Sequence, residues 1–116
     1  MFFPPSNGKS SLNTANILVI RNSDEDKIDS RDKIAIMADG KEILLKNLTI
    51  ETLLESYLPE NKFLQIFRST LINVDHSFTK QNHNTLLFDL PNQTSPLELT
   101  IGRSYTSLFK KRFPNA

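Results

Sequence analysis

The sequence of 116 residues contains no cysteine and only three glycines. Without cysteine the chain has no disulfide, no thiolate metal ligand and no cysteine nucleophile, and a reducing compartment suits it. No apolar run approaches the roughly 18 residues that a membrane-spanning helix needs. The apolar start Met1–Phe3 is stopped by Pro4 and lacks the cationic flank of a signal peptide. We therefore expect a cytoplasmic protein that does not contact a membrane.

The residue patterns of catalytic sites are also missing. His76 and His83 lie in or beside polar turns and lack the spacing of metal ligands. The chain contains no nucleophile elbow and no glycine-rich phosphate loop. The acidic run at residues 24–26 lacks the glycine and the closing glutamate of a calcium loop. We therefore expect no enzymatic activity, no metal and no cofactor.

Charge is distributed unevenly along a chain whose formal net charge is only +1. Residues 34–60 carry five acidic and two basic side chains, whereas residues 103–116 carry four basic side chains and none that is acidic. This asymmetry fits a protein with one basic, anion-binding surface. It fits equally well a solvated helix end whose cations favour the helix dipole. Charge alone leaves both interpretations open.

The length and ordinary composition predict a single domain over residues 1–116 that is mainly β. Residues 1–15 should form a short edge strand at Phe2–Phe3 and a turn, and residues 21–33 a long exposed loop. A strand is expected at residues 16–20, and its four consecutive apolar residues, 17–20, indicate burial on both faces. Asp39-Gly40 between two β-prone runs predicts a hairpin with a type I′ turn. Further strands are expected at residues 63–67, 70–74, 78–81, 85–90 and 97–101.

Two segments have the period of a helix. In residues 49–58 the apolar side chains fall on one stripe, Thr49 is a suitable N-cap, and Pro59 stops the helix. The stripe consists of Ile50, Leu53, Leu54, Tyr57 and Leu58. A short C-terminal helix should follow Gly102, with Ser104 able to cap it. Its stripe consists of Tyr105, Leu108, Phe109 and Phe113.

Three arginines lie where the chain is expected to turn: Arg31, Arg68 and Arg103. Arginine suits bidentate contacts to guanine edges and phosphate. Ser69 and Ser104 each follow an arginine, so their hydroxyl groups could join it on a phosphate. Taken singly, each arginine is explained more simply as solvated, with each serine capping a turn, because an exposed arginine needs no explanation. The remaining phosphate candidates are Lys110, Lys111 and Arg112. We expect Asn73 and His76 to be structural, with a phosphate contact as the weaker alternative for His76.

Residues 63–76, FLQIFRSTLINVDH, resemble the "F-x-R-I-H-R-S-x-L-V-N-x-x-H" signature of LytTR-type DNA-binding domains. Residues 99–105, LTIGRSY, resemble the closing "L-P-V-S-R-x-Y" motif of that family. The resemblance extends over the hairpin at Asp39-Gly40 and the helix to Leu58. The strand–SNGK–strand pattern at residues 3–20 also fits, so the resemblance covers nearly the whole chain.

This resemblance implies an elongated β-β-β arrangement of small antiparallel sheets with one mid-chain helix and one short C-terminal helix. It implies an output domain of a two-component response regulator that inserts loops into successive grooves of double-stranded DNA. A second copy would occupy a direct repeat, and a longer chain would add a receiver domain or answer to a sensor kinase. By alignment Arg31, Arg68 and Arg103 fall on the contact loops. Gln65 and Phe67 replace the usual Arg and His, which implies a different target sequence, weak binding, or a protein-interaction module that has lost DNA competence.

Overall fold

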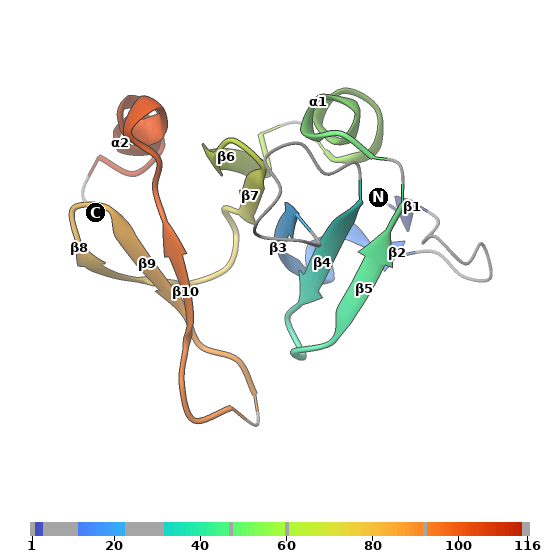
Figure 1. Cartoon of the computed structure of the whole chain (residues 1–116), viewed down its shortest axis with the longest axis horizontal. Helices are drawn as coiled ribbons and strands as arrows, with labels where there is room; N and C mark the ends of the chain where they lie inside the picture. Colours follow the sequence, from blue (N-terminus) through green and yellow to red (C-terminus); the bar gives the residue numbers. More distant parts are fainter. Residues whose placement is uncertain are drawn as a thin grey trace.

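The computed structural model describes residues 2–3, 12–22, 32–46, 48–59, 61–91 and 93–114 of the chain. These residues form three antiparallel sheets, a short 3₁₀ helix η1 (Thr14–Asn16) and two longer helical regions, which confirms the expected mainly β fold (Figure 1). The largest sheet has the strand order β5-β4-β3-β7-β6; the second has the order β10-β9-β8, and the third pairs β1 with β2. The bounds are β1 Phe2–Phe3, β2 Leu12–Asn13, β3 Ile17–Asn22, β4 Lys33–Met37, β5 Glu42–Leu45, β6 Phe63–Phe67, β7 Thr70–Asn73, β8 Thr79–Asn82, β9 Thr85–Phe88 and β10 Leu97–Thr100.

Strand β3 is the centre of the fold. It pairs with β4 on one side and β7 on the other, and all four residues of the apolar run Ile17–Ile20 are buried. The prediction of a strand buried on both faces is therefore confirmed. The strand begins one residue later than expected and continues to Asn22, which is itself buried.

The two faces of the five-stranded sheet pack against different elements. One face buries Ile66, Ile72 and Ile36 against Phe88 and Leu99 of the three-stranded sheet and against the C-terminal helix. The opposite face buries side chains of β3, β4, β6 and β7 against the mid-chain helix. Figure 1 shows the three-stranded sheet with the C-terminal helix α2 (Thr106–Arg112) on one side of the molecule, and β3 to β5 with α1 (Ile50–Thr52) on the other. The five-stranded sheet is therefore the layer shared by both cores.

The hairpin between β4 and β5 forms as expected, but its turn type differs. The amide of Gly40 donates to the carbonyl of Met37 at 2.9 Å, and the amide of Met37 donates to the carbonyl of Lys41 at 2.8 Å. Gly40 has a φ of +92°, whereas Ala38 and Asp39 do not adopt positive φ. A type I′ turn needs positive φ at both central residues, so that prediction is wrong. The connection is the three-residue kind, in which a glycine follows a tight turn and closes the loop with a bulge.

The mid-chain helix begins where the sequence predicts and then widens. Thr49 caps α1 (Ile50–Thr52), its hydroxyl accepting the Thr52 amide at 3.1 Å. The next segment, η2 (Leu53–Tyr57), is a π-helix, closed by a bond from the Leu58 amide to the Leu53 carbonyl at 2.8 Å. The wider turn brings Leu53 and Leu58 into the core but leaves Leu54 exposed. The expected stripe is therefore correct except at Leu54.

The C-terminal helical region starts with a tight turn. Segment η3 (Arg103–Tyr105) precedes α2 (Thr106–Arg112), and no side chain caps either segment. Ser104 lies inside η3, so the expectation that it caps the helix is wrong. Phe109 is almost completely buried, and Tyr105 and Phe113 pack partly against the same core. Leu108, expected on this stripe, is 49% exposed.

The long loop expected at residues 21–33 is shorter at both ends. Arg21 and Asn22 end β3, and Lys33 begins β4, where it pairs with Asn22. Lys33 is only 3% exposed. The sequence suggested a loop here because these residues are polar, but they take the backbone pairs of a central strand. Residues 23–31 of the expected loop lie outside the described residues.

Candidate nucleic-acid interface

Arg68 and Ser69 form the turn between β6 and β7. The last pair of this hairpin joins Phe67 to Thr70, so the connection contains only these two residues. Arg68 is exposed and Ser69 is half-buried. The preceding Phe67 is a large aromatic side chain that is 45% exposed. The chain thus presents a cation and an aromatic ring at the tip of a hairpin.

A β-bulge at the end of β6 brings the second arginine turn to the same place. Gln65 pairs with Leu71 and Phe67 with Thr70, so Ile66 is the extra residue. Its carbonyl oxygen accepts the amide of Gly102 at 2.7 Å. Segment η3 follows directly along the outer edge of β6, which is the last strand of the sheet. Arg103 and Ser104 are both exposed there.

The side chain of Gln65 also links the two turns. Its amide nitrogen Nε2 donates to the carbonyl oxygen of Arg68 at 3.0 Å and to the hydroxyl of Tyr105 at 3.4 Å. The tertiary structure therefore brings together Arg68, Ser69, Arg103 and Ser104, which we call the arginine face. Sequence reasoning missed the role of Gln65 and Tyr105, because no local pattern pairs residues 40 positions apart.

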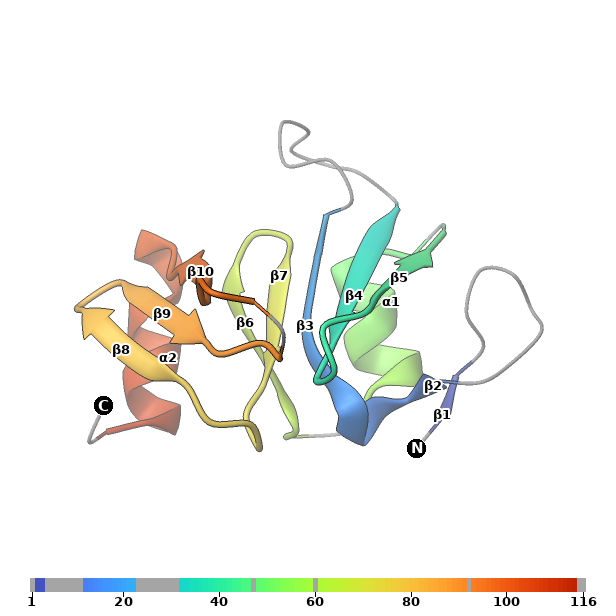
Figure 2. The same ribbon diagram turned by 90° about the horizontal axis from the view of Figure 1, so that it is seen from below.

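Arg31, the third predicted contact, lies outside the described residues, but both flanking strands are described. Strand β3 runs antiparallel to β7, with Ile20 opposite Leu71. The C-terminal end of β3 and the N-terminal end of β7 therefore lie at the same end of the sheet. In Figure 2 the end of β3, the start of β4 and the turn between β6 and β7 lie at the same upper edge. The assignment of Arg31 to the interface stays a prediction.

The remaining predicted cations lie elsewhere. Lys110, Lys111 and Arg112 form the last turn of α2, and all three are exposed. Figure 2 shows α2 running from the upper edge toward the lower edge, where the chain ends. At a rise of about 1.5 Å per residue, this last turn lies roughly 10 Å further along the helix axis than the arginine face. Cations at a helix C-terminus also favour the helix dipole, so their position has a structural explanation as well.

The two residues expected to be structural have structural contacts. The side chain of Asn73 is buried and donates to the carbonyl of Ile17 at 2.9 Å, and more weakly to that of Thr14 at 3.4 Å. Its oxygen Oδ1 accepts the amide of Asp75 at 3.0 Å. His76 Nε2 lies 2.9 Å from the carbonyl oxygen of Ala15. These contacts hold the segment before β3 against the far end of β7, away from the arginine face.

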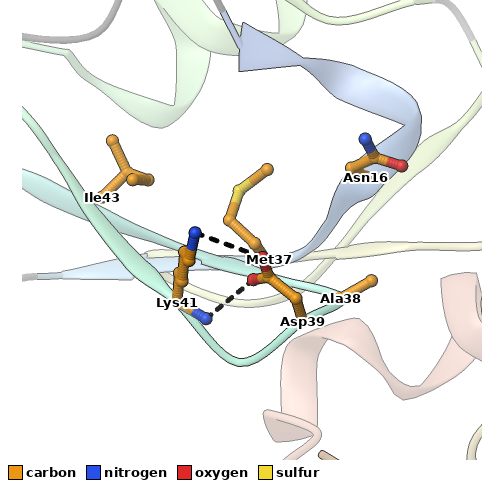
Figure 3. Close-up of a pocket in the computed structure, with 6 residues that line it drawn as sticks. All are labelled: Asn16, Met37, Ala38, Asp39, Lys41 and Ile43. Carbon is orange, nitrogen blue, oxygen red and sulfur yellow. Dashed lines mark hydrogen bonds and ion pairs between the residues drawn. The ribbon is translucent and has the colours of Figure 1, made fainter. Parts of the chain in front are cut away.

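At the opposite end of the sheet the surface has a hollow of about 400 Å³ (Figure 3). Its lining is largely apolar, and the charged residues among the described ones that line it are Asp39 and Lys41, whose exposed side chains approach to 3.9 Å. Among the described residues no cluster of His, Cys, Asp or Glu could hold a metal ion. No helix in the described part of the chain is long and apolar enough to cross a membrane. The hollow is lined by Asn16, Met37, Ala38, Asp39, Lys41 and Ile43.

Comparison with solved structures identifies the fold. A structure described as the LytTr DNA-binding domain of a methyl-accepting/DNA response regulator from Bacillus cereus superposes with a TM-score of 0.65. The match covers 97% of this chain and 94% of that domain, at 18% sequence identity. No family model matches the chain, and no curated protein matches it by sequence. The chain therefore has the fold of a LytTr domain, and the resemblance of its sequence motifs is confirmed at the level of the fold.

Proposed function

We propose that the chain is the sequence-specific DNA-binding domain of a transcriptional regulator. The observation that carries this proposal is the arginine face, where two exposed arginines lie on separate turns that are linked by the side chain of Gln65. The fold supports it, because the superposed Bacillus cereus domain is described as DNA-binding.

The chemistry of the arginine face suits the edge of a DNA groove. A guanidinium group can donate two parallel hydrogen bonds to the O6 and N7 atoms of guanine, or bridge phosphate oxygens. In the proposed complex Arg68 and Arg103 contact bases, and Ser69 and Ser104 donate to the adjoining phosphates. Arg31 is a third contact from the loop before β4. Lys110, Lys111 and Arg112 contribute to phosphate binding further along the duplex.

The regulator we envisage belongs to a two-component system and acts in the cytoplasm. Each domain inserts its turns into successive grooves, and two copies occupy a direct repeat. A receiver domain or a sensor kinase supplies the signal if the domain is part of a longer chain. These partners follow from the LytTR-type motifs of the sequence rather than from contacts of the described residues.

The test starts with a duplex that the domain selects from a random DNA pool. We expect Arg68→Ala to weaken binding to the selected duplex by about 1–3 kcal/mol, the usual value of a bidentate base contact. Lys41→Ala is the control, because Lys41 is an exposed cation at the opposite end of the sheet. Binding should also weaken steeply with salt, since phosphate neutralisation releases counterions. Enrichment of no sequence, or a flat salt dependence, would contradict DNA binding.

The exposure of Phe67 favours a second candidate, a protein-interaction module that has lost DNA competence. An aromatic side chain that is 45% exposed beside a charged turn resembles the anchor of a protein interface. The acidic run at residues 24–26, which also supports this candidate, lies outside the described residues. Sedimentation with and without DNA separates the two candidates. A domain that sediments unchanged with the duplex, but whose binding to a protein partner is lost in Phe67→Ser, would support the second.

A further inference from the structure

The amide of Gln65 is placed between the two turns that carry the arginines. Its single nitrogen Nε2 meets the backbone carbonyl of Arg68 and the hydroxyl of Tyr105, which is two residues after Arg103. A primary amide has two N–H donors, so one side chain can satisfy both acceptors at once. Gln65 is half-buried, which shields these bonds partly from water. The side chain thus forms a bridge between segments that are distant in sequence.

A second contact fixes the same two segments through the backbone. The bulge at Ile66 directs its carbonyl to the amide of Gly102, at 2.7 Å. Gly102 lies close to Tyr105, because an added Cβ would lie 3.0 Å from Cδ2 of the ring, which would have to shift by a few tenths of an ångström. The close approach of Gly102 therefore brings the ring of Tyr105 within reach of Gln65. The backbone contact sets the distance between the turns, and the Gln65 bridge sets their relative orientation.

We propose that Gln65 is a positioning residue that holds the turns of Arg68 and Arg103 in one fixed arrangement for DNA. This inference rests on the proposed function. Gln65 itself contacts no base in this proposal; it acts through the Arg68 backbone and the Tyr105 hydroxyl. The LytTR-type signature usually has an arginine at this position. In this chain Gln65 would therefore replace a cationic side chain by one that links the two turns.

The expected effect on DNA affinity follows from the free-energy cost of ordering the two arginine turns. Two arginines on rigidly linked turns are already arranged when they meet the duplex, whereas turns that move independently must be ordered during binding. Loss of the bridge should therefore weaken binding to the selected duplex by about threefold to tenfold, the effect of about one net hydrogen bond, because the contact to the Tyr105 hydroxyl is long, at 3.4 Å. Binding to a scrambled duplex should change less than about twofold, because non-specific binding depends on phosphate contacts.

The decisive variant is Gln65→Met, which keeps the length and packing volume of the side chain but removes both donors. The matched control is Gln81→Met on β8, where the glutamine is exposed. Affinities of both variants are measured for the duplex selected from a random pool and for a scrambled duplex of equal length. Thermal unfolding of each variant is measured in parallel. We expect Gln65→Met to lose specific affinity with a melting temperature close to that of the parent, and Gln81→Met to lose none.

A double-mutant cycle distinguishes positioning from general stabilisation. If Gln65 positions Arg68, then Arg68→Ala should cost less in the Gln65→Met background than in the parent, and so should Arg103→Ala. The inference would be overturned if the affinity losses of Gln65→Met and of each arginine variant simply multiplied in the double variants. It would also be overturned if Gln65→Met lost affinity equally for both duplexes and had a lower melting temperature. Unchanged affinity of Gln65→Met, with weakened Arg68→Ala and Arg103→Ala, overturns the bridge but leaves the proposed function standing. If neither arginine variant weakens binding, the proposed function fails, and this inference fails with it.

Discussion

The buried amide of Asn73 offers a stability test that is independent of DNA. Asn73→Ala removes three hydrogen bonds, of which two reach residues far away in the sequence and one is local. Asn73 is only 2% exposed. Its side-chain amide donates to the carbonyl oxygen of Ile17 at 2.9 Å, and Ile17 is fully buried. Water cannot easily replace the lost donor at that carbonyl, so the deletion leaves a buried acceptor without a partner.

The expected loss can be worked out bond by bond. An unsatisfied buried carbonyl costs about 1–3 kcal/mol, and the local bond to the Asp75 amide contributes about 1 kcal/mol. The contact to the Thr14 carbonyl is long, at 3.4 Å, and should contribute little. We therefore expect Asn73→Ala to lower the free energy of unfolding by about 2–4 kcal/mol, a large fraction of a typical domain's stability.

Asn82 provides a matched control. Its oxygen Oδ1 accepts the amide of Asn84 at 3.0 Å, which is the same local bond that Asn73 makes to Asp75, but Asn82 is exposed. Asn82→Ala should therefore cost less than about 1 kcal/mol. Urea unfolding of the parent and both variants, with equal slopes, measures the difference. A difference between the two variants below about 0.5 kcal/mol would refute the argument, because the buried donor would then contribute nothing beyond the local bond.

Three further changes test separate parts of the fold. Gly40→Ala forces an L-residue to a φ of +92° and should cost about 1–2 kcal/mol in urea unfolding; an unchanged midpoint would contradict the bulged turn. Gly102→Ala places a Cβ 3.0 Å from the Tyr105 ring and should cost about 1 kcal/mol while shifting the side-chain amide resonance of Gln65; an unshifted resonance would show that the ring does not move. Lys62→Met breaks a 3.1 Å ion pair to Asp75 whose partners are both about half exposed, so it should change stability by less than about 1 kcal/mol, and a larger loss would argue against solvent screening.

The local elements of this fold could be read from neighbouring residues. Thr49 and Gly40 each act on backbone within a few residues, so the helix start and the β4–β5 hairpin were predictable from capping and turn preferences. The turn at Arg68-Ser69 was visible as a break between two apolar strands. Local rules failed where tertiary packing selected another geometry. The π-helix leaves Leu54 exposed although the helical stripe predicted it to be buried, and strand pairing buries Lys33 although its polar neighbours predicted a loop.

The arginine face shows most clearly which features the sequence determined and which depended on the tertiary structure. The sequence by itself determined that Arg68 and Arg103 lie at turns, because strand alternation ends and glycine or polar residues begin beside each of them. The link between their two turns required tertiary structure, since it depends on the bulge at Ile66 and its bond to Gly102. The Gln65–Tyr105 contact spans 40 residues and the Asn73–Ile17 contact spans 56. Such contacts form only after the sheets have packed, because local backbone preferences do not determine which distant donor will bind a given carbonyl.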